Sequence, residues 1–593
     1  MRTIKRLLCC MLFVSTYGIG MLAQENQSYF LHTIEKGQSL YSIASMYGVS
    51  QADIVKLNPG SDEKIYIGRT LRIPRVANNT QKETFHTIAA GETLYRLTVK
   101  YNTTAKAICE ANPGLSAENF KIGQVIRIPS SKGEDSTNKS KEQTQVSESG
   151  VPSAVQSRCR EMHKVKRKET IFSISREYNI TEAELIAANP ELKGKDKIKK
   201  GSWLCIPYPS AVAQQTTDVQ TIPTDSELFN ENKKKNVRFK TIKAAVILPF
   251  LNTSKNESAR MVEYYEGFLM AVDSLKKTGT SIDLYTYSSG SETSSLESIL
   301  KKNELKQVDI IFGPAYHQHI APLASFAKNN NIRLVIPFTS KDNTVFQNPS
   351  IYQINTPQSY LYSEVYDHFV RQFPNANVIF IEASQNTQDK KEFIKGLKEE
   401  LKNRSVSVKS LKKTSSPESF KAVLQEGKSN IFIPTSGSNL TLVKILPQLT
   451  LLVREQPQSD IHLFGYPEWQ TYTEDHLEAF FELDTYFYSS FYTNNLLPAA
   501  TRFTKNYRRW YGKDMGDRYP KYGMLGFDTG FYFLNGLANY GSDFENKMQL
   551  MNIVPIQTGF KFQRVNNWGG FINKKVFFVH FTRNYELVKL DFD

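Results

Sequence analysis

Three stretches in the N-terminal third of the chain share one arrangement of apolar and polar positions. In the first, residues 32–34 alternate as a short strand, and the apolar side chains of Leu40–Tyr47 recur at helical spacing. Ser39 is placed to cap this helix, and Asn58-Pro59 ends a second helical stretch. Residues 65–73 then return as a strand. The pattern predicts a compact βααβ unit.

The same features follow in the same order twice more. The openings begin at His32, His86 and His163, the Asn-Pro pairs are residues 58–59, 112–113 and 189–190, and the closing strands are residues 71–74, 126–129 and 204–207. Such repetition indicates three copies of one small domain, which we place at residues 29–75, 84–130 and 158–208. The three repeats resemble LysM domains, a family that binds the N-acetylglucosamine-containing glycans of peptidoglycan.

The resemblance also implies where a glycan would bind. In LysM domains the sugar lies in a shallow groove between the strand-to-helix loop and the loop after the second helix, and backbone groups make most contacts. By position the implied contacts are Gly37, Gln38, Ser39, Leu40, Asn58 and Pro59; Gly91, Glu92, Thr93, Leu94, Asn112 and Pro113; and Glu169, Thr170, Ile171, Asn189 and Pro190. Lys168 stands where the other repeats have glycine, which predicts a reshaped loop in repeat three. The alternative is that these residues only form turns and caps.

The N-terminus has the composition of a signal peptide. Arg2, Lys5 and Arg6 precede an apolar run at residues 7–22, and Ala23 offers a cleavage site. We therefore expect residues 1–23 to be removed and the protein to be exported to the periplasm, with an uncleaved anchor as the alternative. Cys9 and Cys10 lie at the front of the apolar run, where a lipid-anchor cysteine does not occur. No other apolar run is long enough to span a bilayer.

Three cysteines remain in the mature chain. Cys159 lies just before the first strand of repeat three and Cys205 lies in its last strand, so we predict a disulfide between them, with two free buried thiols as the alternative. Cys109 replaces an apolar residue on the second helix of repeat two and is expected to be a buried small hydrophobe.

The chain is basic, with a formal charge of +15, of which three charges belong to the signal peptide. Export argues against nucleic acid as the partner. Peptidoglycan stem carboxylates or anionic lipid are nearer candidates, and a solvated basic face is the alternative.

Two stretches are poor in apolar side chains and predict linkers at residues 131–157, expected to be disordered, and 209–239. After residue 240 the pattern changes to alternating strands and helices. Strands are predicted at residues 242–250, 282–287, 308–312, 333–336, 377–382, 430–433 and 461–465, and helices at 261–277 and 316–328 and from residues 389 and 438. Buried βαβ units of this kind predict two α/β lobes with parallel sheets over residues 240–593. The alternating aromatic residues 486–488 are expected in the core of a strand.

This region resembles the type I periplasmic binding proteins, the receptors of branched-chain amino acid transporters. The resemblance is carried by residues 245–250, 265–268, 309–314, 332–340 and 526–528. It implies a ligand cleft between the lobes, at the carboxyl ends of the strands, with Tyr316, His317, Thr339, Ser340 and Asp528 near the ligand. His317 replaces a serine and Phe338 a small residue of the amino-acid-binding members. Some outer-membrane activators of peptidoglycan synthases carry the same fold and engage a protein partner instead of a solute.

Enzyme motifs are weak in this sequence. His317-Gln318-His319 has the spacing of a metallopeptidase pair, but it opens a helix and lacks its further ligands, and no His-Glu-x-x-His or Gly-x-Ser-x-Gly motif is present. The carboxylates of a glycosidase have no fixed motif, so a wall hydrolase stays as an alternative. We therefore expect no enzyme, metal or cofactor. The sequence favours a peptidoglycan-bound periplasmic scaffold or regulator of envelope assembly, with a solute receptor as the second hypothesis and a wall hydrolase as the third.

Overall fold

The computed structural model describes most of the chain between residues 29 and 592. The described ranges are 29–35, 38–62, 65–74, 84–129, 161–166, 169–178, 180, 182–189, 192, 198–207, 223–233, 236–340, 342–383, 389–412, 414–494 and 497–592. The predicted signal peptide, the linker at 131–157 and most of the linker at 209–239 lie outside them. The chain forms two compact units, one from residues 1–131 with 224–593 and the other from residues 132–223.

Each repeat folds as the predicted βααβ unit. Repeat one contains β1 (Tyr29–Thr33), α1 (Leu40–Tyr47), α2 (Gln51–Leu57) and β2 (Thr70–Pro74); repeat two contains β3 (Thr84–Thr87), α3 (Leu94–Lys100), α4 (Ala105–Ala111) and β4 (Val125–Ile128); repeat three contains β5 (Glu161–Lys164), α5 (Ile171–Glu177), α6 (Glu182–Ala188) and β6 (Trp203–Ile206). In each, the two strands pair antiparallel. Strand β2 is shorter than the predicted 65–73.

The second predicted linker contains an element that the sequence did not reveal. Residues Asp225–Glu231 form helix α7, whose capping box joins Thr224 to Glu227. Leu228 and Phe229 are buried. The low apolar content of residues 209–239 concealed a helix that has only two apolar anchors.

The first lobe of the C-terminal domain is built on a seven-stranded sheet, ordered β17-β18-β11-β10-β9-β7-β8. Its strands are β7 (Ile242–Leu248), β8 (Ile282–Ser288), β9 (Ile310–Phe312), β10 (Arg333–Ile336), β11 (Ile351–Gln353), β17 (Phe562–Arg564) and β18 (Phe571–Asn573). All neighbours are parallel except β17 and β18. The order β8-β7-β9-β10-β11 is the doubly wound order 2-1-3-4-5, which makes the gap between β7 and β9 the topological switch point.

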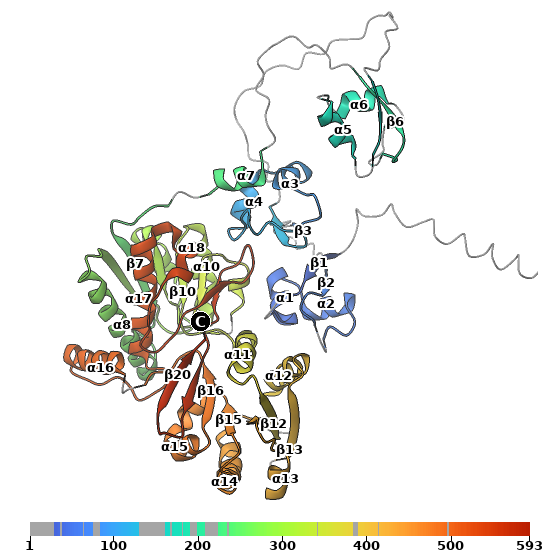
Figure 1. Cartoon of the computed structure of the whole chain (residues 1–593). Helices are drawn as coiled ribbons and strands as arrows, with labels where there is room; N and C mark the ends of the chain where they lie inside the picture. The colour runs from blue at the N-terminus through green and yellow to red at the C-terminus, as the bar shows by residue number, and fades with distance from the viewer. Residues whose placement is uncertain are drawn as a thin grey trace, which may run out of the picture. The chain divides into compact units, whose positions relative to one another are not determined.

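The second lobe repeats this arrangement with the order β13-β12-β14-β15-β16-β19-β20 (Figure 1). Its strands are β12 (Ala376–Glu382), β13 (Ser407–Lys412), β14 (Ser429–Pro434), β15 (Ile461–Gly465), β16 (Thr485–Ser489), β19 (Phe577–Phe581) and β20 (Leu587–Asp591). The first five are parallel, and β19 and β20 add antiparallel. The predicted pair of α/β lobes with parallel sheets is confirmed.

The helices connect these strands as crossovers. The α-helices are α8 (Lys255–Lys276), α9 (Glu297–Leu300), α10 (Ile320–Asn329), α11 (Gln358–Gln372), α12 (Lys391–Asn403), α13 (Pro417–Ala422), α14 (Asn439–Glu455), α15 (Thr473–Glu482), α16 (Pro498–Tyr511), α17 (Tyr522–Tyr540) and α18 (Phe544–Lys547). Short 3₁₀ turns are η2 (Glu304–Gln307), η3 (His317–His319), η4 (Thr344–Phe346), η6 (Pro467–Tyr472), η7 (Gly541–Asp543) and η8 (Met548–Leu550). In the described part of the chain, no helix combines the length and apolar character needed to cross a bilayer.

Glycines allow α8 and α17 to approach closely. A side chain on Gly267 would collide with the backbone carbonyl of Gly523, and one on Gly526 would collide with that of Tyr264. Gly267 and Gly526 are two of the residues that carry the family resemblance, and their role here is helix packing.

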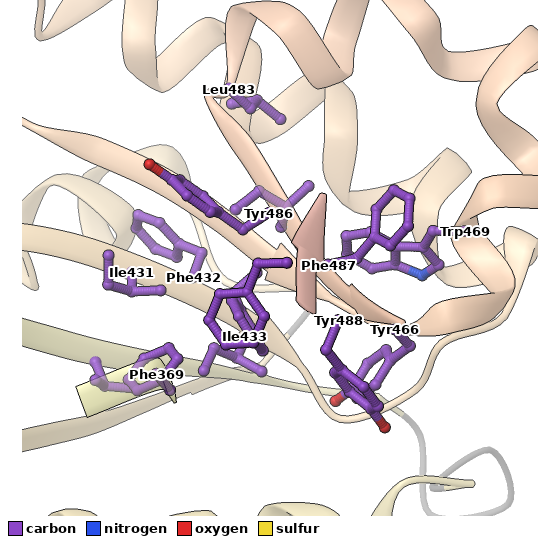
Figure 2. Close-up of a cluster of buried hydrophobic side chains, with 14 of the residues drawn as sticks. Phe369, Ile431, Phe432, Ile433, Tyr466, Trp469, Leu483, Tyr486, Phe487 and Tyr488 are labelled. Atoms are coloured by element: carbon purple, nitrogen blue, oxygen red, sulfur yellow. The ribbon is translucent and has the colours of Figure 1, made fainter. Parts of the chain in front are cut away.

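The core of lobe two is aromatic, as the residues at 486–488 predicted. Tyr486, Phe487 and Tyr488 are all buried, and Phe432 and Trp469 pack in the same cluster (Figure 2). Strand β16 pairs with β15 and β19, and all five of its residues are buried, so neither of its faces is open to solvent.

Candidate functional site

The strand-to-helix loops of the repeats end on helix caps. Ser39, Thr93 and Thr170 each accept a hydrogen bond from the backbone amide three residues later, at the start of α1, α3 and α5. These residues therefore shape the loop through their hydroxyl groups. Their backbone atoms form the helix side of the predicted groove. The first residues of the three helices, Leu40, Leu94 and Ile171, lie on the same side.

The residue before each cap is held by a histidine of the first strand. Gln38 Oε1 lies 2.8 Å from His32 Nε2, Glu92 Oε2 lies 2.6 Å from His86 Nε2, and Glu169 Oε2 lies 2.9 Å from His163 Nε2. The same oxygens accept from the backbone amides of Glu35, Ala89 and Lys166. Gln38, Glu92 and Glu169 thus fold their side chains back to brace the loop.

A tyrosine at the end of the first helix fixes the other side of each histidine ring. The hydroxyl groups of Tyr47, Tyr101 and Tyr178 lie 2.7, 2.9 and 2.9 Å from Nδ1 of the three histidines. We did not assign these residues a role from the sequence. One signal was available in the sequence. In every repeat the histidine is followed six residues later by Gln or Glu and fifteen residues later by Tyr.

Two of the bracing carboxylates have lowered pKa values. Burial alone would raise the pKa of Glu92, but the hydrogen bonds from the Ala89 amide and His86 outweigh it. The Lys166 amide, followed by His163, lowers the pKa of Glu169. Both side chains therefore carry a charge that serves the loop at neutral pH.

The three Asn-Pro asparagines have a structural role that the sequence prediction did not include. Asn112 Nδ2 donates to the carbonyls of Ile108 and Arg127, at 2.8 and 2.6 Å, and its Oδ1 accepts from the Arg127 amide at 2.8 Å. Asn58 and Asn189 make the same three bonds. These side chains join the second helix to the last strand, so only their backbone is available to a glycan. Pro59 and Pro113 are exposed, whereas Gly37 and Pro190 lie outside the described residues.

Repeat one has an open cavity beside this loop. Its volume is about 560 Å³, and it is lined by Leu40, Gln51, Ala52, Val55, Lys56 and Asp62. The cavity therefore lies between the start of α1, one face of α2 and the segment after α2. Among the predicted contact residues of repeat one, Leu40 lines this cavity.

One cluster of possible metal ligands occurs in repeat three. Within the described ranges, His163, Glu169 and Glu177 are the group whose ligand atoms lie within 4.8 Å of one another. Glu169 already accepts from His163 and from the Lys166 amide. His163 and Glu169 therefore already have a structural role in bracing the loop.

A polar network lies at the switch point of lobe one, beyond the carboxyl ends of β7 and β9. Thr253, which follows β7, lies 2.7 Å from the hydroxyl of Tyr316, which follows β9. Glu257 at the start of α8 accepts from both residues, at 2.8 and 3.2 Å. These bonds lower the pKa of Glu257, with the Thr253 and Ser254 hydroxyl groups as the largest causes. Tyr316 therefore lies where predicted, but its hydroxyl is engaged.

The other predicted cleft residues separate into two groups. His317, Thr339 and Ser340 follow the paired strands β9 and β10, and His317 Nδ1 lies 3.4 Å from Asp342 Oδ2. Asp528 lies within helix α17, is 3 % exposed, and accepts from the amides of Ile556, Gln557 and Thr558. Burial raises the pKa of Asp528 to about 6 despite these bonds. Asp528 is thus an anchor for a loop, not a residue on a cleft loop as we predicted.

The corresponding edge of the lobe two sheet carries an ion pair that we did not predict. Lys390 Nζ lies 2.5 Å from Glu468 Oε1 and 3.6 Å from Asp389 Oδ2, next to the ring of Tyr466. The Gly437 amide, beyond the end of β14, donates to Asp389. No local sequence signal marks this pair, because its members are more than one crossover apart.

Comparison with known proteins agrees with the repeat geometry. Residues 32–74, 86–129 and 163–207 match the family model described as LysM domain. The chain carries three LysM domains. An N-acetylmuramoyl-L-alanine amidase sle1 of Staphylococcus epidermidis is 29% identical over 119 residues, which are 19% of this chain and 36% of that protein. The chain thus spans about a third of the length of this relative.

Solved structures cover the C-terminal domain. A putative branched-chain amino acid ABC transporter protein from Rhodospirillum rubrum has 9% identity, covers 59% of this chain and all of that chain, and gives a TM-score of 0.41. A branched-chain amino acid ABC transporter periplasmic ligand-binding protein from Burkholderia xenovorans has 12% identity, 59% and 95% coverage, and a TM-score of 0.38. The strand order 2-1-3-4-5 in both lobes defines a bilobed α/β architecture for the C-terminal part of this chain.

Proposed function

We propose that this protein is a non-enzymatic, peptidoglycan-binding protein of the periplasm, exported by its N-terminal signal and attached to the wall by its LysM domains. Its receptor-like domain acts as a scaffold or regulator of envelope assembly. LysM domains and receptor-like lobes are both binding modules, which supports a role without catalysis. Attachment through several weak glycan sites gains from effective concentration.

The packing of the first two LysM domains on lobe one carries this proposal. Trp568, in the turn between β17 and β18, is 2 % exposed and has its ring 5.2 Å from Phe85 and 5.9 Å from Tyr47. Phe30 lies 5.5 Å from Phe85 in the same cluster. This buried aromatic cluster supports a lasting contact between the LysM pair and lobe one, which belong to the same compact unit.

Polar contacts extend this junction. Asn567 donates to the Val125 carbonyl at 3.2 Å, and its own carbonyl accepts from the Gly114 amide at 2.8 Å. Gln347 donates to the Met46 carbonyl at 2.6 Å. A solute carrier has to move between its ligand and its permease, whereas a receptor fold fixed to wall-binding domains suits a stationary scaffold.

The experiment is sedimentation of the mature chain with purified peptidoglycan. We expect the protein to sediment and an excess of N-acetylglucosamine pentamer to release it. Ala52→Trp fills the cavity of repeat one and should weaken binding several-fold. The matched control Val99→Trp adds the same side chain at an exposed helix position of repeat two and should leave binding unchanged. Sedimentation that is insensitive to the sugar and equal in both variants would reject the proposal.

A solute or sensing receptor for amino acids, peptides or muropeptides is the second candidate. It is favoured by the polar groups at both switch points, Thr253, Glu257 and Tyr316 in lobe one and Lys390 with Glu468 in lobe two. Such groups suit a ligand with hydroxyl, amide or charged groups better than an apolar solute.

A further inference from the structure

Helix α7 packs on the second LysM domain although it lies far from it in sequence. It contacts α3 and α4, and Leu228 and Phe229 join the core cluster of repeat two. The ring of Phe229 lies 5.9 Å from that of Phe120, and both anchors of α7 are 9 % exposed. The helix is therefore held by apolar contacts to this one domain.

The surface that α7 covers corresponds to the open cavity of repeat one. Leu40 and Leu94 each begin the first helix of their repeat, and Asn58 and Asn112 each follow the second helix, so the two domains align with a constant offset. The cavity-lining residues Leu40, Gln51 and Val55 correspond in this alignment to Leu94, Ala105 and Cys109. Leu94 belongs to the cluster that contains Leu228 and Phe229, and Ala105 and Cys109 pack against this cluster.

A carboxylate of α7 also takes a backbone donor of the groove. The Leu94 amide donates to Asp225 Oδ1 at 2.8 Å. Leu94 is fully buried, whereas Leu40 is half-buried. Backbone donors at this loop are the groups expected to bind a glycan, so Asp225 and a sugar acceptor need the same atom.

A short tether keeps α7 close to this surface. Shortly after α7, the Val237 amide donates to Ser542 Oγ at 2.8 Å and its carbonyl accepts from the Ser542 amide at 2.9 Å. Val237 is thus fixed beside the end of α17. When α7 leaves the groove, this attachment keeps the helix nearby at a high effective concentration. Closure is then reversible without a separate partner.

We infer that helix α7 is an internal ligand that occupies the glycan groove of the second LysM domain and must leave before a glycan binds there. The inference rests on the proposed glycan binding and adds its regulation: repeat one is open, and repeat two is closed by the chain itself. Since only the open fraction binds, the apparent affinity of repeat two is reduced by that fraction.

The test uses the full mature chain and the N-acetylglucosamine pentamer as probe. In the double variant Leu228→Asp/Phe229→Asp, the anchors of α7 become charged and the helix should dissociate. Hydrogen exchange should then show that the sugar protects residues 91–97 in the variant but not in the wild type, with an affinity gain of about ten- to a hundredfold at this loop if α7 is closed 90–99% of the time. Protection of residues 38–45 in repeat one should be the same in both proteins.

The matched control is Ser226→Asp/Asn230→Asp, which adds the same charges on the exposed positions of α7 and should behave as the wild type. Alkylation of Cys109, a free thiol, reports groove opening without any sugar and should be faster only in the anchor variant. Equal alkylation in all three proteins, or equal sugar protection of residues 91–97, would overturn the inference. A third outcome is that Cys109 reacts faster in the anchor variant but the sugar protects neither repeat. That result would reject the proposed glycan binding, and with it the competition between α7 and a glycan.

Discussion

At the scale of single residues, His462 is the group whose charge state matters most for lobe two. Its Nε2 lies 2.9 Å from Asp460, and its Nδ1 lies 2.8 Å from Asp484 in an ionic contact that is poorly aligned for a hydrogen bond. Burial alone would lower the pKa of His462, but the contacts with Asp460 and Asp484 outweigh it and raise the pKa to about 9. His580 lies 2.8 Å from the other oxygen of Asp484.

This raised pKa predicts a loss of stability at alkaline pH. The folded protein holds the His462 proton more tightly than the unfolded chain, so the stabilisation is fully present below pH 6.5 and is lost between pH 6.5 and about 9. The pKa difference corresponds to an upper value of about 3 kcal/mol. We expect pulse proteolysis in urea at pH 6 and pH 9.5 to show this loss in the wild type and a much smaller one in His462→Asn. An equal pH dependence in both proteins would contradict the assignment.

At the scale of elements, the third LysM domain depends on the pairing of its first and last strands. Cys205 lies in β6, where it is 7 % exposed, and Cys109 in repeat two is a free cysteine. Cys159 lies outside the described residues, so its pairing with Cys205 remains a prediction. Cys109 is partly buried, less than the buried hydrophobe that we expected. Its burial raises the pKa of the thiol to about 11, which disfavours a reactive thiolate.

Reduction should therefore loosen repeat three before the other repeats. A bond between Cys159 and Cys205 closes a loop of nearly fifty residues, for which loop entropy gives a stabilisation of about 4 kcal/mol. Hydrogen exchange with and without reductant should show faster exchange in α5 and α6 and no change in α1 to α4. Peptide mapping of protein from the periplasm that finds both thiols free would disprove the bond.

At the scale of the whole molecule, a thermal-shift screen separates a scaffold from a solute receptor. A ligand at a hundredfold excess over its Kd stabilises a protein by about 2.7 kcal/mol. We expect free amino acids to give no large thermal shift in the mature chain. His317 is paired with Asp342, Phe338 is packed against Tyr264 and Tyr522, and Asp528 is engaged by three backbone amides.

The screen should include free amino acids, short peptides and muropeptide fragments. A shift of several degrees with leucine that Ser340→Ala abolishes would replace the scaffold proposal with the sensor. A shift with wall fragments alone that persists when the grooves of all three LysM domains are blocked would indicate that the C-terminal domain and the LysM domains bind the same polymer.

The sequence by itself determined the repeats and the alternation of strands and helices. Helix caps, Asn-Pro stops and apolar spacing are local features, so residues 40–47 and 333–336 were predicted with the bounds that the structure has. The aromatic strand at 486–488 was recognised as core for the same reason, since its side chains leave no polar face.

Only the tertiary structure decided which of the predicted site residues are free to bind. Asn58, Asn112 and Asn189 serve the strand after them, and Asp528 serves a loop at residues 556–558, because buried backbone amides and carbonyls require partners from distant segments. The aromatic junction joins Trp568 to Phe85, which lies hundreds of positions earlier in the chain. The packing of α7 on repeat two likewise joins Asp225 to Leu94, in a different part of the chain. Local periodicity carries no information about such contacts, since a segment with two apolar anchors becomes a stable helix only against the surface that buries them.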